Sequence, residues 1–151
     1  MTRSVTKYRS AQRNDVLLSK SGSIGTAAIV ETDAPFSIYE SIFALRGRPG
    51  VLTPRFLLAT LRAQTTQAQY MAHLVGMGVT HLNMSDIIDV RIPVPPSTEQ
   101  TLIAEFVDST TERLVQQERL LQLSVDRIRE YRQALITAAV TGKIDVSKEA
   151  A

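Results

Sequence analysis

The sequence predicts an α+β protein in which a small domain of short strands and one helix is followed by one long C-terminal helix. Up to residue 96, short apolar runs alternate with turns rich in glycine and serine, a pattern typical of strands. A Pro-Pro pair at 95 and 96 comes next, and residues 97–141 then contain neither proline nor glycine. With 151 residues, the chain is about one domain in size.

The bulk composition excludes several classes of protein. Apolar residues make up 44% of the chain, enough for a core, and the net charge of +2 is too small to indicate a nucleic-acid partner by itself. The absence of cysteine excludes disulfides, thiol nucleophiles and cysteine-ligated metals. No apolar run approaches the ~20 residues of a membrane span, and the N-terminus lacks the apolar segment of a signal peptide. We therefore expect a soluble, cytoplasmic protein.

The N-terminal residues 1–14 are basic. Arg3, Lys7, Arg9 and Arg13 all precede the first acidic residue, Asp15. A basic arm beside a folded domain attracts phosphates. A disordered, solvated terminus has the same composition, so the sequence leaves both interpretations open.

Residues 15–46 have the pattern of short strands. Apolar runs at 15–19 and 24–30 flank a Gly/Ser turn at 20–23, which predicts a β-hairpin. Two further strands are expected at 36–38 and 41–46.

A helix is expected over residues 54–72. Thr53 supplies a hydroxyl at the N-cap and Pro54 stands at the first helical position. Beyond this helix, Ser85 is expected to cap a short turn that ends at Ile88. Residues 90–94 alternate apolar and other side chains, as in an edge strand that tolerates proline.

The long helix is expected to begin at Ser97 with a capping box, because Gln100 follows three residues later. Gly142 can adopt the left-handed conformation that ends a helix. Between them lies one helix of about 44 residues, or roughly 66 Å.

Two apolar seams along this helix recur every seven residues, which favours a left-handed coiled coil. The first seam is Val107, Leu114, Leu121, Ile128 and Leu135. The second seam, polar in its middle, is Ile103, Thr110, Gln117, Ser124, Tyr131 and Ala138. The alternative is that the helix packs on its own domain, but that domain is too short to cover both ends.

The sequence contains no convincing catalytic or metal-binding constellation. His73 and His81 have neither cysteine partners nor metal-ligand spacing. The glycine-rich stretch at 19–25 lacks the phosphate-loop pattern, and the TGK at 141–143 ends a helix where a phosphate loop must open one. We expect a protein that is not an enzyme and that binds no cofactor.

Four stretches carry a family resemblance. DVLLSKSGSIGTAAIV, LTPRFLLATL, RIPVPPSTEQTLIAEFVD and YRQALITAAVTGKIDV occur in this order between Asp15 and Val146. Together they resemble the specificity (S) subunit of type I restriction–modification enzymes. The resemblance divides the chain into a basic arm (1–14), a partial target recognition domain (15–96), a coiled-coil helix (97–141) and a tail (142–151).

The resemblance implies a non-catalytic subunit that recognises a DNA sequence. S subunits usually carry two target recognition domains, each reading half of a split DNA site, and two antiparallel helices that fix the spacing. Methylation with S-adenosylmethionine belongs to separate methyltransferase (M) subunits, and cleavage belongs to restriction (R) subunits. This chain has one short domain and one helix, so it is expected to form a homodimer or to pair with another S subunit. The alternative is a structural or regulatory fragment that pairs through its helix without reading DNA.

If the domain reads DNA, hydrogen-bond donors on loops are the candidate contacts. Lys20, Ser21, Ser23, Arg46 and Arg48 suit phosphates. Thr80, His81 and Asn83 follow the glycine pair at 76 and 78, and an asparagine can pair with adenine through two hydrogen bonds. Ordinary loop chemistry explains the same residues equally well.

Overall fold

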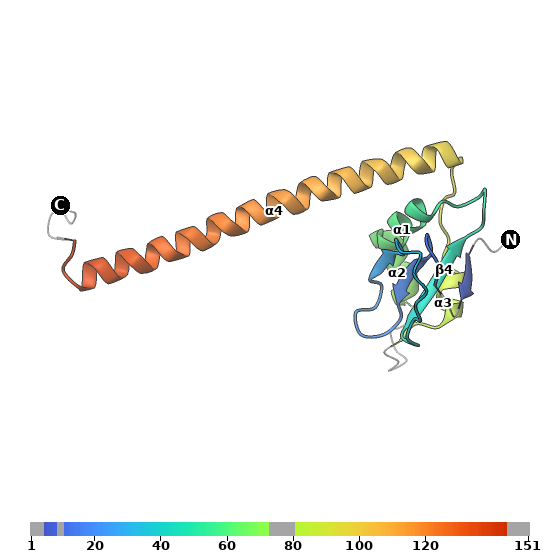
Figure 1. The fold of residues 1–151 in the computed structure, drawn as a ribbon, viewed down its shortest axis with the longest axis horizontal. Coiled ribbons are helices and arrows are strands. Elements are labelled where there is room, and N and C mark those ends of the chain that lie inside the picture. The colour runs from blue at the N-terminus through green and yellow to red at the C-terminus, as the bar shows by residue number, and fades with distance from the viewer. Residues whose placement is uncertain (1–4, 9–10, 73–80, 145–151) are drawn as a thin grey trace. The chain divides into compact units, whose positions relative to one another are not determined.

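The computed structural model describes residues 5–8, 11–72 and 81–144, which form two units divided after Val107 (Figure 1). The first unit contains a sheet, three short helices and the first turns of the last helix, which then continues through the second unit. The elements are β1 (Val5–Tyr8), β2 (Val16–Ser19), β3 (Ala27–Ile29), β4 (Ile42–Gly47), α1 (Pro54–Arg62), α2 (Gln64–Ala72), α3 (Met84–Ile88) and α4 (Ser97–Val140). Short strands, short helices and one long helix confirm the predicted fold class.

The four strands form one antiparallel sheet in the order β1-β4-β2-β3. The hairpin predicted around residues 20–23 is β2 and β3, and the strand predicted at 41–46 is β4. The strand predicted at 36–38 was wrong, because this segment belongs to the loop before β4. Phe36 and Ile38 pack instead on a small second core with Val30 and Ala44.

Part of the predicted basic arm belongs to the sheet. Residues 5–8 form β1, which pairs with β4 in the register Val5 with Gly47 and Tyr8 with Ala44. The backbone of residues 5–8 is therefore ordered by a ladder of hydrogen bonds where the sequence indicated only charge.

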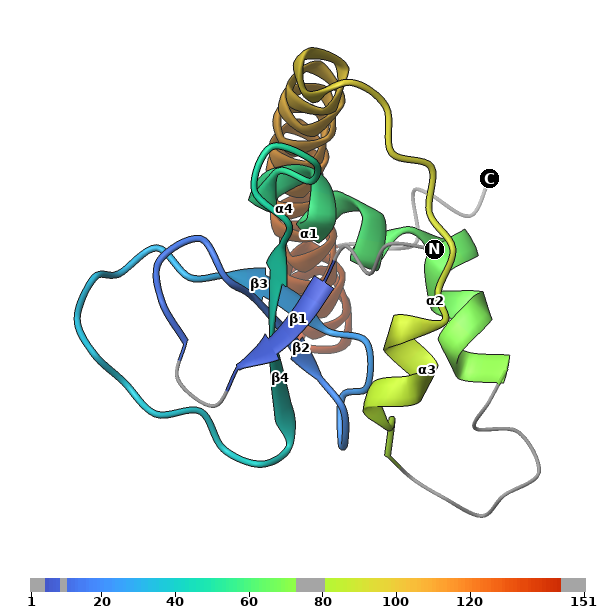
Figure 2. The same ribbon diagram turned by 90° about the vertical axis from the view of Figure 1, so that its right-hand side faces the viewer.

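The main core lies on one face of the sheet. Alternate residues of β2 and β4 are fully buried there, among them Val16, Leu18 and Leu45, because successive side chains of a strand point to opposite faces. The helices α1, α2 and α3 lie on this side of the sheet (Figure 2). Helix α1 contributes Phe56, Leu57, Leu58 and Leu61 to this core.

The helix predicted over 54–72 is two helices. It begins at Pro54 as predicted, but the Thr53 hydroxyl makes no capping bond and is buried without a partner. Ala63 ends α1 with an extended ψ of 133°, and α2 then starts at Gln64. This change of direction lets Tyr70 enter the main core, where it is fully buried.

Residues 90–94 do not form the predicted edge strand. The side-chain amide of Gln69 takes the place of a neighbouring strand. Its Oε1 accepts the Arg91 N–H at 2.9 Å, and its Nε2 donates to the Arg91 carbonyl at 3.0 Å. A single side chain on α2 thus satisfies the donor and acceptor that a strand would otherwise need to pair.

Helix α4 confirms the predicted length, but the capping box predicted at its start was wrong. Gln100 is fully buried, and its Oε1 accepts the Thr53 N–H at 2.8 Å. Its Nε2 donates to the carbonyls of Val51 and Pro95, both at 2.8 Å. Gln100 therefore binds the backbone groups of Thr53, Val51 and Pro95 instead of closing a capping box with Ser97. At the other end, Gly142 has the predicted positive φ of 70°.

Candidate nucleic-acid interface

Two loops that are distant in sequence lie side by side at one end of the sheet. Ser21, in the turn between β2 and β3, forms an isolated antiparallel bridge with His81. The N–H of the buried Leu82 donates to the Lys20 carbonyl at 2.8 Å. We call residues 20–23 and 81–83 the loop pair. It brings together five predicted DNA contacts: Lys20, Ser21, Ser23, His81 and Asn83.

The first loop is held in a defined shape by local hydrogen bonds. The Ser19 hydroxyl donates to the Ser21 carbonyl at 2.8 Å, and the Gly25 N–H donates to the Ser19 carbonyl at 3.0 Å. The Lys20 ammonium lies 5.6 Å from the centre of the Phe43 ring, a cation–π distance. The loop thus presents its hydroxyls and its cation from a fixed backbone.

The second loop enters a short helix. Asn83 is the N-cap of α3, where the sequence predicted Ser85, and its N–H donates to the Asp86 carboxylate at 2.7 Å. His81 and Asn83 are both exposed. Thr80, the remaining candidate in this loop, lies outside the described residues.

Tyr70 fixes the distance between the first loop and the helical layer. Gly25 closes the loop with a φ of +86°, and a Cβ at this position would lie only 2.8 Å from the Tyr70 Oη. The Tyr70 side chain is fully buried, and this burial raises the pKa of its hydroxyl above the ordinary value. Sequence reasoning missed both residues as determinants of the loop: the glycine-rich motif marks Gly25, but no local signal marks Tyr70.

We expect Gly25→Ala to destabilise the domain clearly more than Gly22→Ala. Both glycines have positive φ, which costs roughly 1–2 kcal/mol for a residue with a Cβ. Only at Gly25 does the new methyl group also meet a buried side chain, which adds about 1–3 kcal/mol. Urea denaturation of both variants measures the difference. Adding Tyr70→Phe should recover part of the loss in Gly25→Ala but none in Gly22→Ala; equal effects of the two alanines contradict the proposed contact.

The two predicted arginine contacts lie at the opposite end of β4 from the loop pair. Ser19 pairs with Ile42 at one end of this strand, and Arg46 lies near the other. The six residue-to-residue steps from Ile42 to Arg48 correspond to about 20 Å of extended chain. Arg48 is exposed in the turn that follows β4. The structure therefore does not gather all the candidates at one place.

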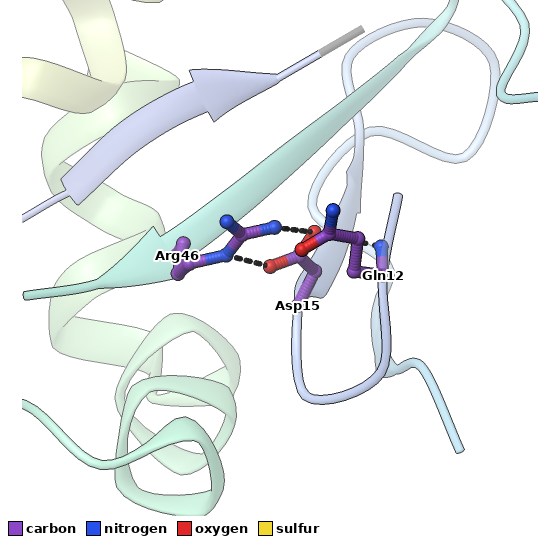
Figure 3. A network of polar contacts seen from close by, with 3 residues as sticks. All are labelled: Gln12, Asp15 and Arg46. Carbon is purple, nitrogen blue, oxygen red and sulfur yellow. Dashed lines mark hydrogen bonds and ion pairs between the residues drawn. The ribbon is translucent and has the colours of Figure 1, made fainter. Parts of the chain in front are cut away.

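Arg46 binds a buried carboxylate (Figure 3). Its Nε donates to Asp15 Oδ1 at 2.5 Å, and its Nη2 donates to Asp15 Oδ2 at 2.7 Å. The Gln12 N–H donates to the same Oδ2 at 2.9 Å. Asp15 is fully buried, and its place beside Arg46 follows from the register of Val16 with Leu45. This bidentate pair gives Arg46 a structural role, joining the start of β2 to the end of β4.

The described residues contain no group of three or more side chains suited to hold a metal ion. Among the same residues, no helix is both long enough and apolar enough to cross a membrane.

A family model of the type I restriction modification DNA specificity domain matches residues 3–124. The chain belongs to this family. The match covers the sheet, the loop pair, the short helices and more than half of α4, so the specificity-domain assignment applies to the candidate interface and to the start of the helix alike.

Curated relatives of this specificity domain are type I subunits. The chain is 26% identical over 129 residues to the Escherichia coli "Type I restriction enzyme EcoDI specificity subunit", covering 85% of this chain and 28% of that protein. It is 32% identical over 73 residues to the EcoBI specificity subunit of the same organism, covering 48% of this chain and 15% of that protein. The chain thus spans less than a third of the length of either relative.

Solved structures show the same fold. A chain from work on the "structural basis underlying complex assembly and conformational transition of the type I R-M system" has a TM-score of 0.71 at 23% identity, covering 89% of this chain and 32% of that one. The HsdS subunit from Thermoanaerobacter tengcongensis has a TM-score of 0.55 at 24% identity, covering 76% of this chain and 26% of that one. The combination of a small sheet domain and a long helix is therefore shared with these subunits.

Proposed function

We propose that this chain is a non-catalytic, DNA-recognising subunit of a type I restriction–modification system and that the loop pair contacts one half of the target site. The observation that carries the proposal is the bridge between Ser21 and His81, which joins two sets of hydrogen-bond donors within a DNA specificity domain. Methyltransferase and restriction subunits supply methylation and cleavage in this scheme, and the chain docks the methyltransferase subunits.

The residues of the loop pair divide into two chemical roles. Lys20 and the hydroxyls of Ser21 and Ser23 suit phosphate oxygens, which fix position without reading sequence. His81 and Asn83 suit base edges, and the donor and acceptor of the Asn83 amide complement the N7 acceptor and the N6 donor of adenine in the major groove. Arg48 is the proposed phosphate contact at the far end of β4, since two nitrogens of Arg46 already bind Asp15.

DNA affinity measured at several salt concentrations and on different duplex sequences separates these two roles. We expect selection from a randomised duplex pool to yield a preferred sequence whose binding weakens steeply as salt rises. Lys20→Ala should lower the slope of log affinity against log salt by about 1, without changing the preference. Asn83→Ser keeps a capping residue on α3 but removes the amide, so it should cost about 1–3 kcal/mol on the preferred sequence and relax the preference.

The matched control for these variants is Arg119→Ala, a charge change on the exposed surface of α4. It should leave both the salt slope and the sequence preference unchanged. Wild-type protein that binds all duplexes equally, or none at low salt, overturns the proposed recognition function.

We further propose that α4 pairs with a second long helix, from another copy of this chain or from another specificity subunit. Four of the five residues of the first seam, all except Val107, are exposed within the single chain: Leu121 and Ile128 are each 67% exposed, Leu114 is 59% exposed and Leu135 is 45% exposed. A row of exposed large apolar side chains indicates an interaction surface. This observation also favours the alternative function, a fragment that assembles without reading DNA, and binding to methyltransferase subunits with no DNA shift at low salt would support that alternative.

The charges of α4 favour an antiparallel pair. Residues 97–118 are acidic and residues 119–140 are basic, so two antiparallel copies place opposite charges side by side, whereas parallel copies place like charges together. The first half contains Glu99, Glu105, Asp108, Glu112 and Glu118 against Arg113. The second half contains Arg119, Arg127, Arg129 and Arg132 against Asp126 and Glu130.

A further inference from the structure

Arg62, the last residue of α1, binds the edge of the sheet. Its Nε and Nη2 donate to the Ala27 carbonyl at 3.2 and 2.9 Å. Ala27 is the first residue of β3, which lies at one edge of the sheet. Arg62 is nevertheless exposed to solvent. The DNA contacts proposed above do not include Arg62, so its position needs a separate explanation.

Two contacts place the end of α1 beside the first loop of the loop pair. Ala27, which accepts from Arg62, follows Gly25 by only two residues, at most about 7 Å of extended chain. The Tyr70 hydroxyl, which a Cβ at Gly25 would meet at 2.8 Å, donates to the Leu61 carbonyl at 3.5 Å. Arg62 therefore lies where the first loop enters β3.

Lys20 and Arg62 approach this loop from the same side of the sheet. Leu18 faces the main core, and the ammonium of Lys20, two residues later, lies over the ring of Phe43 in the same core. Helix α1, which carries Arg62, lies on this side of the sheet (Figure 2). One cation is therefore placed where the loop leaves β2, and the other where it enters β3.

The Arg62 guanidinium keeps donors and charge that its bonds to Ala27 do not use. A guanidinium has five N–H donors. The Ala27 carbonyl accepts from one on Nε and one on Nη2, so three remain, two on Nη1 and one on Nη2. Nη1 and Nη2 form a fork that matches two phosphate oxygens. Among the described residues, Arg62 makes no ion pair with a carboxylate, whereas Arg13 and Arg46 each pair with an aspartate.

We propose that Arg62 binds a phosphate of the DNA backbone beside the loop pair. This inference rests on the proposed function and deepens it, because it adds a contact from the helical layer to those of the two loops. The DNA backbone then runs along the helix side of the sheet, past Lys20 and Arg62. The bonds to Ala27 also give Arg62 a structural role at the β3 edge, so the test must separate the two roles.

The bonds to Ala27 prepare Arg62 for this contact. A long side chain loses rotamer freedom when it binds a partner, and that loss opposes binding. The Arg62 side chain is already held by the Ala27 carbonyl, so less freedom remains to be lost when a phosphate binds. Its fork is therefore presented from a fixed position, like the donors of the first loop.

The dependence of DNA affinity on salt tests the proposal in the full chain. The probe is a duplex that carries the sequence selected by the wild-type protein. Losing one phosphate contact should lower the slope of log affinity against log salt by about 0.9 in Arg62→Ala. The loss of affinity should then be about 3.5-fold smaller at 200 mM than at 50 mM salt, and the sequence preference should not change.

The matched control is Arg55→Ala, which removes an exposed arginine near the other end of the same helix and should leave the slope unchanged. Two further variants separate charge from the support of β3. Arg62→Gln keeps an N–H donor on a neutral side chain and should lower the slope as Arg62→Ala does. Arg62→Lys keeps the charge and should keep the wild-type slope. Urea denaturation checks the fold of each variant, and Arg62→Gln decides the test if Arg62→Ala does not fold.

The outcomes distinguish this inference from the function on which it rests. A wild-type slope in Arg62→Gln, or an equal fall in Arg55→Ala, overturns the phosphate contact but leaves DNA recognition by the loop pair intact. An equal fall in Arg62→Lys and Arg62→Gln does the same, because it assigns the effect to support of β3. A wild-type chain that binds no duplex at low salt overturns both.

Discussion

Replacing Leu121 and Ile128 together with aspartate should convert a dimer of this chain into monomers. Each of these side chains stabilises the pair by roughly 1.5–3 kcal/mol when it is buried. Two copies lose four such side chains, and the new carboxylates must also leave water, so the dimer constant should weaken by at least about 1,000-fold. Light scattering over a range of concentrations measures the change in mass.

The control for this double variant is Gln116→Asp, which adds a carboxylate to the same helix outside both seams. It should leave the mass unchanged, and circular dichroism should show the same helix content in both proteins. An unchanged mass in the Leu121→Asp, Ile128→Asp protein would falsify the coiled-coil interpretation.

Removing the buried carboxylate in Asp15→Ala should strongly destabilise the domain. It leaves the Arg46 guanidinium, whose side chain is only 30% exposed, without its bidentate partner. Breaking a buried ion pair in this way costs about 3–5 kcal/mol, a range that the partial exposure of Arg46 lowers here to roughly 2–4 kcal/mol. The midpoint of urea denaturation of the full chain measures the loss.

Asp33→Ala supplies a matched control, because Asp33 also pairs with an arginine, Arg13, but in solvent. A solvent-exposed pair contributes little to stability, so this variant should leave the free energy of unfolding nearly unchanged. Adding Arg46→Met to Asp15→Ala removes the guanidinium that has lost this carboxylate and should restore part of the stability. If Asp15→Ala and Asp33→Ala behave alike, the buried pair has no special role in the domain.

Features that depend on a repeated or local pattern could be predicted from the sequence. Helix α4 follows from the absence of proline and glycine over 97–141, and its end follows from Gly142, because both effects act within a few residues. The β2–β3 hairpin follows from apolar runs around the Gly/Ser turn. In each case the signal and its structural consequence involve the same residues.

The predictions that were wrong involve side chains whose partners are distant in sequence. The Ser97–Gln100 spacing indicates a capping box, but Gln100 binds Thr53 and Val51, nearly fifty residues earlier. The apolar face over 54–72 indicates one helix, but burial of Tyr70 in the core requires a break at Ala63. A single sequence has no signal for such partners, because many residues could satisfy the same amide or fill the same space.

The candidate DNA interface shows the same difference between local patterns, which could be predicted, and contacts between distant residues, which could not. Loop composition singled out hydrogen-bond donors such as Lys20 and His81, but it could not indicate that these two loops lie side by side. Loop composition also grouped Arg46 with Arg48, because two arginines separated by one residue look equivalent in a sequence. The strand register brings Arg46 beside Asp15 and leaves Arg48 in an exposed turn.

The two hydrogen bonds between Gln69 and Arg91 make the backbone pairing of residues 90–94 depend on a single side chain. Strands such as β2 and β4 pair through groups that every residue except proline supplies, so almost any substitution leaves their ladder intact. Residues 90–94 lack this tolerance, because the backbone N–H and carbonyl of Arg91 pair with the side-chain amide of Gln69. A point mutation of Gln69, twenty-two residues before Arg91, should therefore remove the backbone pairing of the segment that leads into α4 without any change in that segment's own sequence.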